Sequence, residues 1–227
     1  MEYELRLYRD QLQARAPASA LAAGSAVRVI YVVEGALRLR TADSPACLSA
    51  NSAWQGASAV QLSGTHAATA VLRWELVRRG APPGPLQGPG AASTLALSAP
   101  LSLDASQPCL LRCDRVDFPP RGEALTHTHR GPGIRCLLSG GIRIETGGAA
   151  HTYAPPGAWF ETGPDPVYAA AAPHAATAFA RVMILPRELL GKPSIRYVKA
   201  EDLDKPKSQS YQIFIDEPIE LPGAGAS

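Results

Sequence analysis

The stretch Gly35-Ala-Leu-Arg-Leu39 returns in the second half of the chain as Gly140-Gly-Ile-Arg-Ile144, an offset of 105 positions (140 minus 35). At the same offset Ser52-Ala-Trp54 corresponds to Gly157-Ala-Trp159. Self-similarity at a fixed spacing is the sequence signature of a repeated structural unit. The first two landmarks therefore indicate that the two halves of the chain share one design.

A third landmark follows in the same order. His66-Ala-Ala-Thr-Ala-Val-Leu-Arg73 corresponds to His174-Ala-Ala-Thr-Ala-Phe-Ala-Arg181 at an offset of 108 (174 minus 66). The change of offset implies a three-residue insertion in the second half. Since alanine-rich sequence raises the rate of chance matches, the Trp and His anchors carry most of the weight. We conclude that the chain contains a tandem duplication.

The sequence pattern of each half is typical of short β-strands. Residues 27–33 (VRVIYVV) are rich in β-branched side chains and end at a Glu-Gly turn signal, and Leu37 to Arg40 alternates apolar and polar residues. Residues 134–138 and 142–145 repeat this pattern. Gly and Pro occur at short intervals, and no long helical periodicity is present. The sequence therefore predicts an all-β fold of two barrels or sandwiches.

Composition suggests where the halves end. The segment from Gly80 to Gly90 is rich in Pro and Gly and predicts a linker. All four lysines lie in the last 36 residues, which sets the C-terminal stretch apart. We expect an N-terminal barrel, a linker, a C-terminal barrel and a C-terminal extension over residues 1–80, 81–95, 96–186 and 187–227.

The C-terminal extension is predicted to contain secondary structure. A helical turn is expected at residues 187–190, and residues 195–198 and 211–215 resemble strands. These strands could complete a sheet within the chain or add to the edge of a neighbouring subunit. We expect a homodimer formed through sheet edges or this tail.

Charge and hydropathy exclude several classes of partner. The formal net charge is +2 and no dense basic run is present, so we expect no nucleic-acid partner. The uncharged segment from Ser44 to Leu72 is too polar for a membrane span, and residues 1–10 lack the pattern of a signal peptide. The four cysteines have no CxxC spacing and are expected to be buried thiols. We expect a cytoplasmic protein.

A histidine pair marks the second half. In Gly122-Glu-Ala-Leu-Thr-His127-Thr-His129 the two histidines are separated by one residue. On a strand such residues point to the same face. If that face lines the barrel interior, both imidazoles converge and could hold a divalent metal ion. The alternative is a pair of surface or polar-core histidines.

The segment from Pro119 to Pro186 resembles the cupin superfamily, and residues 27–77 resemble it more weakly. The first motif of that superfamily is similar to G-x5-H-x-H-x3-4-E-x6-G, and its second motif is similar to G-x5-P-x-G-x2-H-x3-N. The resemblance implies two tandem double-stranded β-helix (jelly-roll) cupin barrels. It also implies that His127 and His129 bind a divalent metal ion such as Fe, Mn, Ni or Zn.

Other ligands of the family pattern are missing. The glutamate expected after the pair falls at Gly133 or Ile134, and the histidine of the second motif falls at Val167 or Tyr168. In the first half the segment 21–24 (LAAG) contains no histidine. We expect the N-terminal barrel to be free of metal.

Three further residues are candidates for the site. Glu161 could supply a third ligand or a catalytic carboxylate, because its first-half counterpart is Gly56; alternatively it lies at a barrel mouth. Tyr168 could reach inward as a hydrogen-bond donor or proton-transfer group. Arg135 could bind a carboxylate substrate, or point outward from its strand.

Two functions of different classes remain open. The first is a metal-dependent enzyme, of dioxygenase, hydrolase or isomerase type, acting on a small organic acid or related metabolite. The second is a non-catalytic ligand-binding or sensory cupin with an eroded metal site. The missing ligands favour the second and the histidine pair favours the first. Both predict a small-molecule ligand, and neither identifies it.

Overall fold

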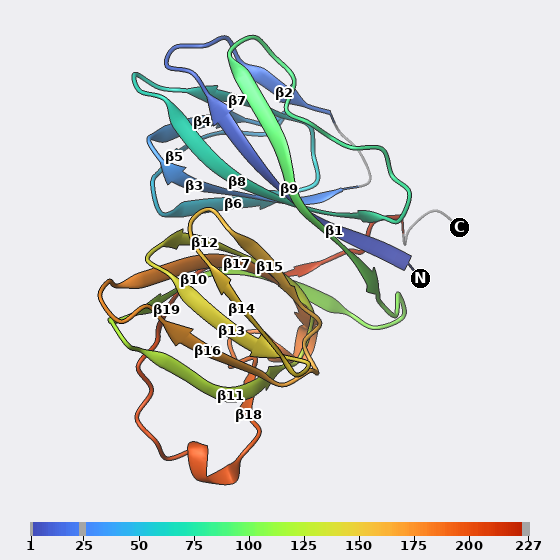
Figure 1. The fold of residues 1–227 in the computed structure, drawn as a ribbon. Coiled ribbons are helices and arrows are strands. Elements are labelled where there is room, and N and C mark those ends of the chain that lie inside the picture. Colours follow the sequence, from blue (N-terminus) through green and yellow to red (C-terminus); the bar gives the residue numbers. More distant parts are fainter. Residues whose placement is uncertain (1, 23–25, 224–227) are drawn as a thin grey trace. The chain divides into compact units, whose positions relative to one another are not determined.

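The computed structural model describes residues 2–22 and 26–223 and is built almost entirely of β-strands (Figure 1). The chain divides into two compact units. Unit 1 comprises residues 1–106 together with 220–227, and unit 2 comprises Gln107–Ile219. In the part of the chain that the structure describes, no helix is long and apolar enough to cross a membrane.

Unit 1 consists of two antiparallel sheets. One sheet has the strand order β6-β3-β8-β1-β9 and the other has the order β2-β7-β4-β5. Both sheets supply side chains to one hydrophobic core, with Ile30 and Leu62 among its fully buried members. The strands are β1 (Glu2–Leu12), β2 (Ser19–Leu21), β3 (Val27–Glu34), β4 (Ala36–Arg40), β5 (Pro45–Ser49), β6 (Ser52–Gly56), β7 (Val60–Gly64), β8 (Thr69–Arg78) and β9 (Ala91–Ser102).

Unit 2 repeats this arrangement. Its sheets have the strand orders β15-β12-β17-β10-β19 and β14-β13-β16-β11-β18. Trp159 and Phe179 pack edge to face in its core, with ring centroids 5.2 Å apart. The strands are β10 (Cys109–Phe118), β11 (Glu123–His129), β12 (Gly133–Ser139), β13 (Ile142–Thr146), β14 (Ala149–Tyr153), β15 (Ala158–Glu161), β16 (Val167–Ala171), β17 (Thr177–Pro186), β18 (Ile195–Tyr197) and β19 (Ser210–Ile219).

Strand pairing shows which residues of the two units occupy equivalent positions. In unit 1 Ile30 lies opposite Arg73, and in unit 2 Arg135 lies opposite Arg181. Arg28 pairs with Gly56 in the first unit as Gly133 pairs with Glu161 in the second. The all-β, two-barrel prediction is confirmed, and equivalent positions can be compared directly.

The unit boundary differs from the expected domain limits. We expected a linker at residues 81–95, but β9 begins at Ala91 and pairs with β1 along its length. In the C-terminal extension, β18 pairs with β11 and β19 pairs with β10. Of the two alternatives for the extension, the structure shows strands that complete sheets within the chain. Composition could not reveal this, because the partners of β9 and β19 lie far away in sequence.

Candidate metal centre in the second barrel

The two histidines lie at the end of β11 and face the barrel interior. His127 and His129 alternate with Thr128 on this strand, and each imidazole residue is only 5% exposed. A register shift between Ala124 and His127 interrupts the pairing of β11 with β16 just before the pair. The expectation that both rings share one interior face therefore holds in the structure.

The two imidazole rings are nearly perpendicular, with an interplanar angle of 81° and ring centroids 4.8 Å apart. His127 Nδ1 lies 2.7 Å from the carbonyl oxygen of Leu125, which can only accept, so this nitrogen carries the hydrogen. The Nε2 lone pair of His127 then points toward Nε2 of His129, 3.2 Å away. Either His129 donates a hydrogen bond to it, or both lone pairs face a common cation.

Burial keeps both imidazoles neutral. Desolvation lowers the pKa of His127, with only partial compensation from its bond to Leu125 and from Glu161. Desolvation lowers the pKa of His129 well below its usual value, and the nearby guanidinium groups of Arg181 and Arg135 add to this effect. Neutral imidazole is the form that binds metal ions.

Glu161 is the third member of the cluster. It ends β15 and is 7% exposed. Its Oε1 accepts a hydrogen bond of 2.8 Å from the indole nitrogen of Trp159. Its Oε2 lies 3.5 Å from Nε2 of His129 and 2.6 Å from Nη2 of Arg135. The structure thus brings Glu161 to the histidine pair and does not leave it at the barrel mouth.

Arg135 points into the barrel and is fully buried. Desolvation lowers its pKa to about 10, although Glu161 opposes this effect. Its Nη1 donates to the carbonyl oxygen of Gly133 at 2.6 Å, while Nε and Nη2 make no well-directed hydrogen bond to any described residue. The guanidinium is therefore held by Glu161 yet retains unused donors.

A second buried ion pair was missed from the sequence. Arg181 Nε lies 2.6 Å from Oδ1 of Asp114, and both side chains are almost fully buried. The repeat contained a signal for the arginine, because Arg181 matches Arg73. Nothing comparable marked Asp114, whose equivalent by strand register in unit 1 is Tyr8.

The structure does not bring Tyr168 to the cluster. On β16 its neighbours Val167 and Ala169 are buried and Tyr168 alternates with them, so its ring lies on the outer face of the sheet. Its hydroxyl donates to Glu123 at 2.6 Å, and this bond raises the pKa of Tyr168 to about 12. The expected inward orientation of Tyr168 is thus corrected by the alternation of the strand.

Solved structures of low sequence identity share this architecture. A conserved protein of unknown function from Pseudomonas aeruginosa PAO1 aligns with a TM-score of 0.52 at 16% identity, covering 80% of each chain. A deletion mutant of Bacillus subtilis oxalate decarboxylase aligns with a TM-score of 0.56 at 12% identity, covering 83% of this chain and 73% of that chain. A mutant of salicylate 1,2-dioxygenase from Pseudoaminobacter salicylatoxidans gives 0.52 at 11%, covering 92% and 74%.

The chain has the cupin fold. No family model and no curated protein matches its sequence. At Gly133, one of the two positions where the resemblance would place a glutamate, the backbone leaves no room for a side chain. A Cβ atom on Gly133 would lie 2.4 Å from the carbonyl oxygen of Val182. Val167, one of the two positions where the resemblance would place a histidine, is part of the hydrophobic core.

The histidine pair and Glu161 supply only part of a metal site. Two nitrogens bound to one metal at about 2.1 Å, with a near-tetrahedral angle, are separated by about 3.2–3.4 Å, and the pair in this cupin shows 3.2 Å. Oε2 of Glu161, the oxygen nearer the pair, lies 3.5 Å from Nε2 of His129 and is paired with Nη2 of Arg135 at 2.6 Å. However, no group of three His, Cys, Asp or Glu residues within the described chain is gathered closely enough to hold a metal. The pair fits two coordination positions, and Glu161 would have to shift its contact with Arg135 to fill a third.

Proposed function

We propose that this cupin binds a divalent metal ion through Nε2 of His127 and His129 and, at the open coordination positions, a small organic acid or related metabolite. The separation of 3.2 Å between the two nitrogens carries the proposal. Their neutrality and the orientation of His127 by Leu125 support it, because a ligating imidazole is normally fixed by a hydrogen bond from its other nitrogen.

Glu161 and Arg135, which form an ion pair beside the histidines, would be the charged groups nearest to a bound ligand. The carboxylate of Glu161 can approach the metal or hold a proton near the bound ligand, while Trp159 fixes its other oxygen. The guanidinium of Arg135 has donors left to receive the carboxylate of a ligand. When bound, the metal would polarise a coordinated oxygen as a Lewis acid.

Elemental analysis of the purified protein tests this proposal. We expect Fe, Mn, Ni or Zn near one equivalent per chain after dialysis against each metal, and its loss in the His127→Ala/His129→Ala variant. The matched control is His151→Ala/His174→Ala, which removes two exposed histidines instead. Metal bound equally by all three proteins, or by none, would overturn the proposal. Loss of metal from both Glu161→Ala and Glu161→Gln would indicate ligation by the carboxylate, whereas loss from Glu161→Ala alone would indicate a packing effect.

A second function, ligand binding without metal, is favoured by the contact between Arg135 and Glu161. An arginine on the candidate third ligand stabilises the carboxylate in the absence of a cation. This cupin would then bind a small acid directly through the unused donors of Arg135, without turnover. Binding of a small carboxylate that survives both chelator treatment and the double histidine substitution would support this function over the first.

A further inference from the structure

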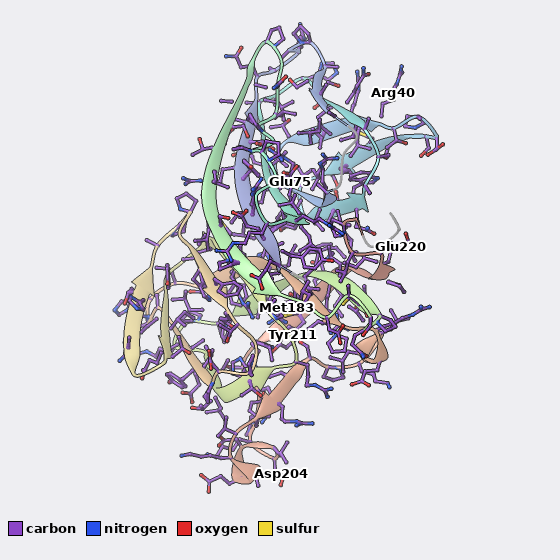
Figure 2. The ribbon with its side chains drawn as sticks, turned by 90° about the vertical axis from the view of Figure 1, so that its right-hand side faces the viewer. Arg40, Glu75, Met183, Asp204, Tyr211 and Glu220 are labelled. Carbon is purple, nitrogen blue, oxygen red and sulfur yellow. The ribbon has the colours of Figure 1, made fainter. Side chains whose placement is uncertain are left out.

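The first barrel has a polar interior of its own, where the sequence predicted no site. Arg28 and Glu75 are both buried, and Nε of Arg28 donates to Oε1 of Glu75 at 2.9 Å. By strand register these two residues occupy the positions that Gly133 and Met183 occupy beside the second-barrel cluster. Figure 2 labels Glu75 inside unit 1 and Met183 inside unit 2. The same location in each barrel therefore carries different chemistry.

A cavity of about 360 Å³ lies over this ion pair. Its walls are mainly apolar and include Leu21, Ala26 and Val77, while Arg28 and Glu75 supply its charged groups. Ligand cavities of proteins typically start at about 300 Å³ and combine apolar walls with a few polar groups. The size and lining of this cavity are therefore suitable for a small organic ligand.

A proline-rich strap, residues 81–87, forms one wall of the cavity. Arg6 donates to the carbonyl oxygens of Ala81 and Pro82 at one end of the strap, and Gly84 N donates to the hydroxyl of Tyr8. At the other end the strap pairs with Ala20 through an isolated β-bridge. The segment that composition suggested was a linker thus has fixed contacts around the mouth of the first barrel.

The ion pair has unused hydrogen-bonding capacity. Oε1 of Glu75 accepts from Arg28 and from Arg73, but Oε2 receives no hydrogen bond from the residues that the structure describes. The guanidinium of Arg28 uses three of its five N–H groups, on Glu75, Ser58 and Ala22. The cavity therefore offers one acceptor and spare donors side by side.

The charge balance indicates what kind of ligand this cavity accepts. The connected buried groups are the two arginines Arg28 and Arg73 and the two acids Glu75 and Asp10, so their charges cancel. Bringing an unpaired charge into this buried network would cost free energy that a neutral ligand avoids. A carboxamide presents an acceptor next to a donor without net charge.

We propose that the first barrel binds a small neutral carboxamide-type ligand in the cavity between Arg28, Glu75 and the proline-rich strap. The amide oxygen accepts from Arg28, the amide nitrogen donates to Oε2 of Glu75, and the apolar body lies against Leu21 and Val77. This site is independent of the metal proposed in the second barrel.

The test uses benzamide as the probe, with benzoate and benzylamine as analogues of similar shape that carry opposite charges. Binding to the full chain is measured by isothermal calorimetry and ligand-observed NMR. We expect benzamide to bind more tightly than either analogue, and to bind equally well to His127→Ala/His129→Ala. No binding of benzamide, or tighter binding of a charged analogue, would overturn the assignment.

The blocking variant is Gly84→Ala. A Cβ atom at this position would lie 3.1 Å from Oε2 of Glu75, and the substitution removes no charged group. We expect benzamide affinity to fall by about tenfold or more, as loss of one buried hydrogen bond implies. Gly141→Ala in unit 2, where the nearest atom lies at 3.4 Å, is the matched control.

A second variant tests the same cavity independently, in case Gly84→Ala misfolds. Ala20→Leu narrows the mouth from β2, where Ala20 is exposed and lines the cavity. If Gly84→Ala and Ala20→Leu both retain the thermal unfolding midpoint of the parent and both bind benzamide as the parent does, the cavity is not the binding site.

Discussion

Nη2 of Arg135 lies 2.6 Å from Oε2 of Glu161, and the two side chains are 0% and 6% exposed. This contact joins two oppositely charged side chains next to the histidine pair. The pair balances charge in a place where either group alone would be strongly disfavoured. The ion pair therefore links the stability of the second barrel to the metal site proposed above, because Glu161 belongs to both.

Removing one partner of this ion pair should be costly. We expect Arg135→Leu to lower the free energy of unfolding by about 3–5 kcal/mol, because Glu161 would remain buried without its cation. The double variant Arg135→Leu/Glu161→Leu should recover much of this loss, because both charges are then absent. Urea unfolding of the parent, the two single variants and the double variant gives the coupling energy.

The exposed pair Arg143–Glu145 on β13 provides the control for that measurement. Exposed ion pairs contribute about 0–1 kcal/mol, so Arg143→Leu should change stability by less than Arg135→Leu does. Equal losses from the buried and the exposed arginine would show that the buried pair is not a stabilising contact.

Acid should destabilise the metal-free protein through the buried histidines. The folded pKa values of His127 and His129 are lowered by desolvation, so below the unfolded value of about 6.5 the unfolded chain binds more protons than the folded one. Stability is therefore present at neutral pH and is lost as the pH falls from about 6.5 towards the folded pKa values. The loss amounts to about 1.4 kcal/mol per unit of pKa difference per histidine.

Denaturant unfolding between pH 8 and pH 5 measures this effect. The decrease in the free energy of unfolding per pH unit should be smaller in His127→Asn/His129→Asn than in the parent. It should be unchanged in the exposed-histidine variant His151→Ala/His174→Ala. A slope that is the same in all three proteins would assign the acid sensitivity to other groups.

Gly133 should not accept the glutamate of the family pattern. A Cβ atom there would collide with the backbone oxygen of Val182 and lie 2.8 Å from Cγ of Met183. We expect even Gly133→Ala to lower the free energy of unfolding by about 1–3 kcal/mol through overpacking. Gly133→Glu should be less stable still and should bind no additional metal. A stable Gly133→Glu protein with raised metal affinity would contradict the packing seen here.

Tyr168→Phe should leave metal and ligand binding unchanged. The hydroxyl of Tyr168 contacts Glu123 on the outer face, so its removal is a surface change of about 0.5 kcal/mol or less. Metal titration and thermal unfolding of this variant beside Glu161→Gln compare the outward and the inward candidate. A loss of metal affinity in Tyr168→Phe would require an orientation different from that in the structure.

The repeat made the two-barrel fold predictable, because Trp54 and Trp159 occupy equivalent positions in both halves. The spacing of His127 and His129 predicted that both imidazoles point to one face of a strand. Glu161 could be found because its counterpart is a glycine. The outward orientation of Tyr168 follows from its alternation with the buried Val167 and Ala169 on β16, and the sequence VYAAA does not show which of the two faces is buried.

Other features arise from contacts between distant residues. Asp114 meets Arg181, which is 67 positions away, beside the register shift that follows Cys113 on β10. The proline-rich strap has the composition of a linker, and only its hydrogen bonds to Arg6 and Tyr8 show that it belongs to the first barrel. Local composition does not encode such partners.

The position of β19 bears on how the second barrel could be produced by itself. The motif resemblance to cupins ends near Pro186, yet β10 pairs on one side with β17 and on the other with β19, which ends at Ile219. A recombinant fragment ending at Pro186 would leave β10 with unpaired N–H and C=O groups along one edge of the sheet. Such an edge promotes association between molecules. Fragment boundaries at Gln107 and Ile219 would instead retain every strand of that sheet, and comparing the solubility of the two fragments would reveal how much the late strand protects the barrel.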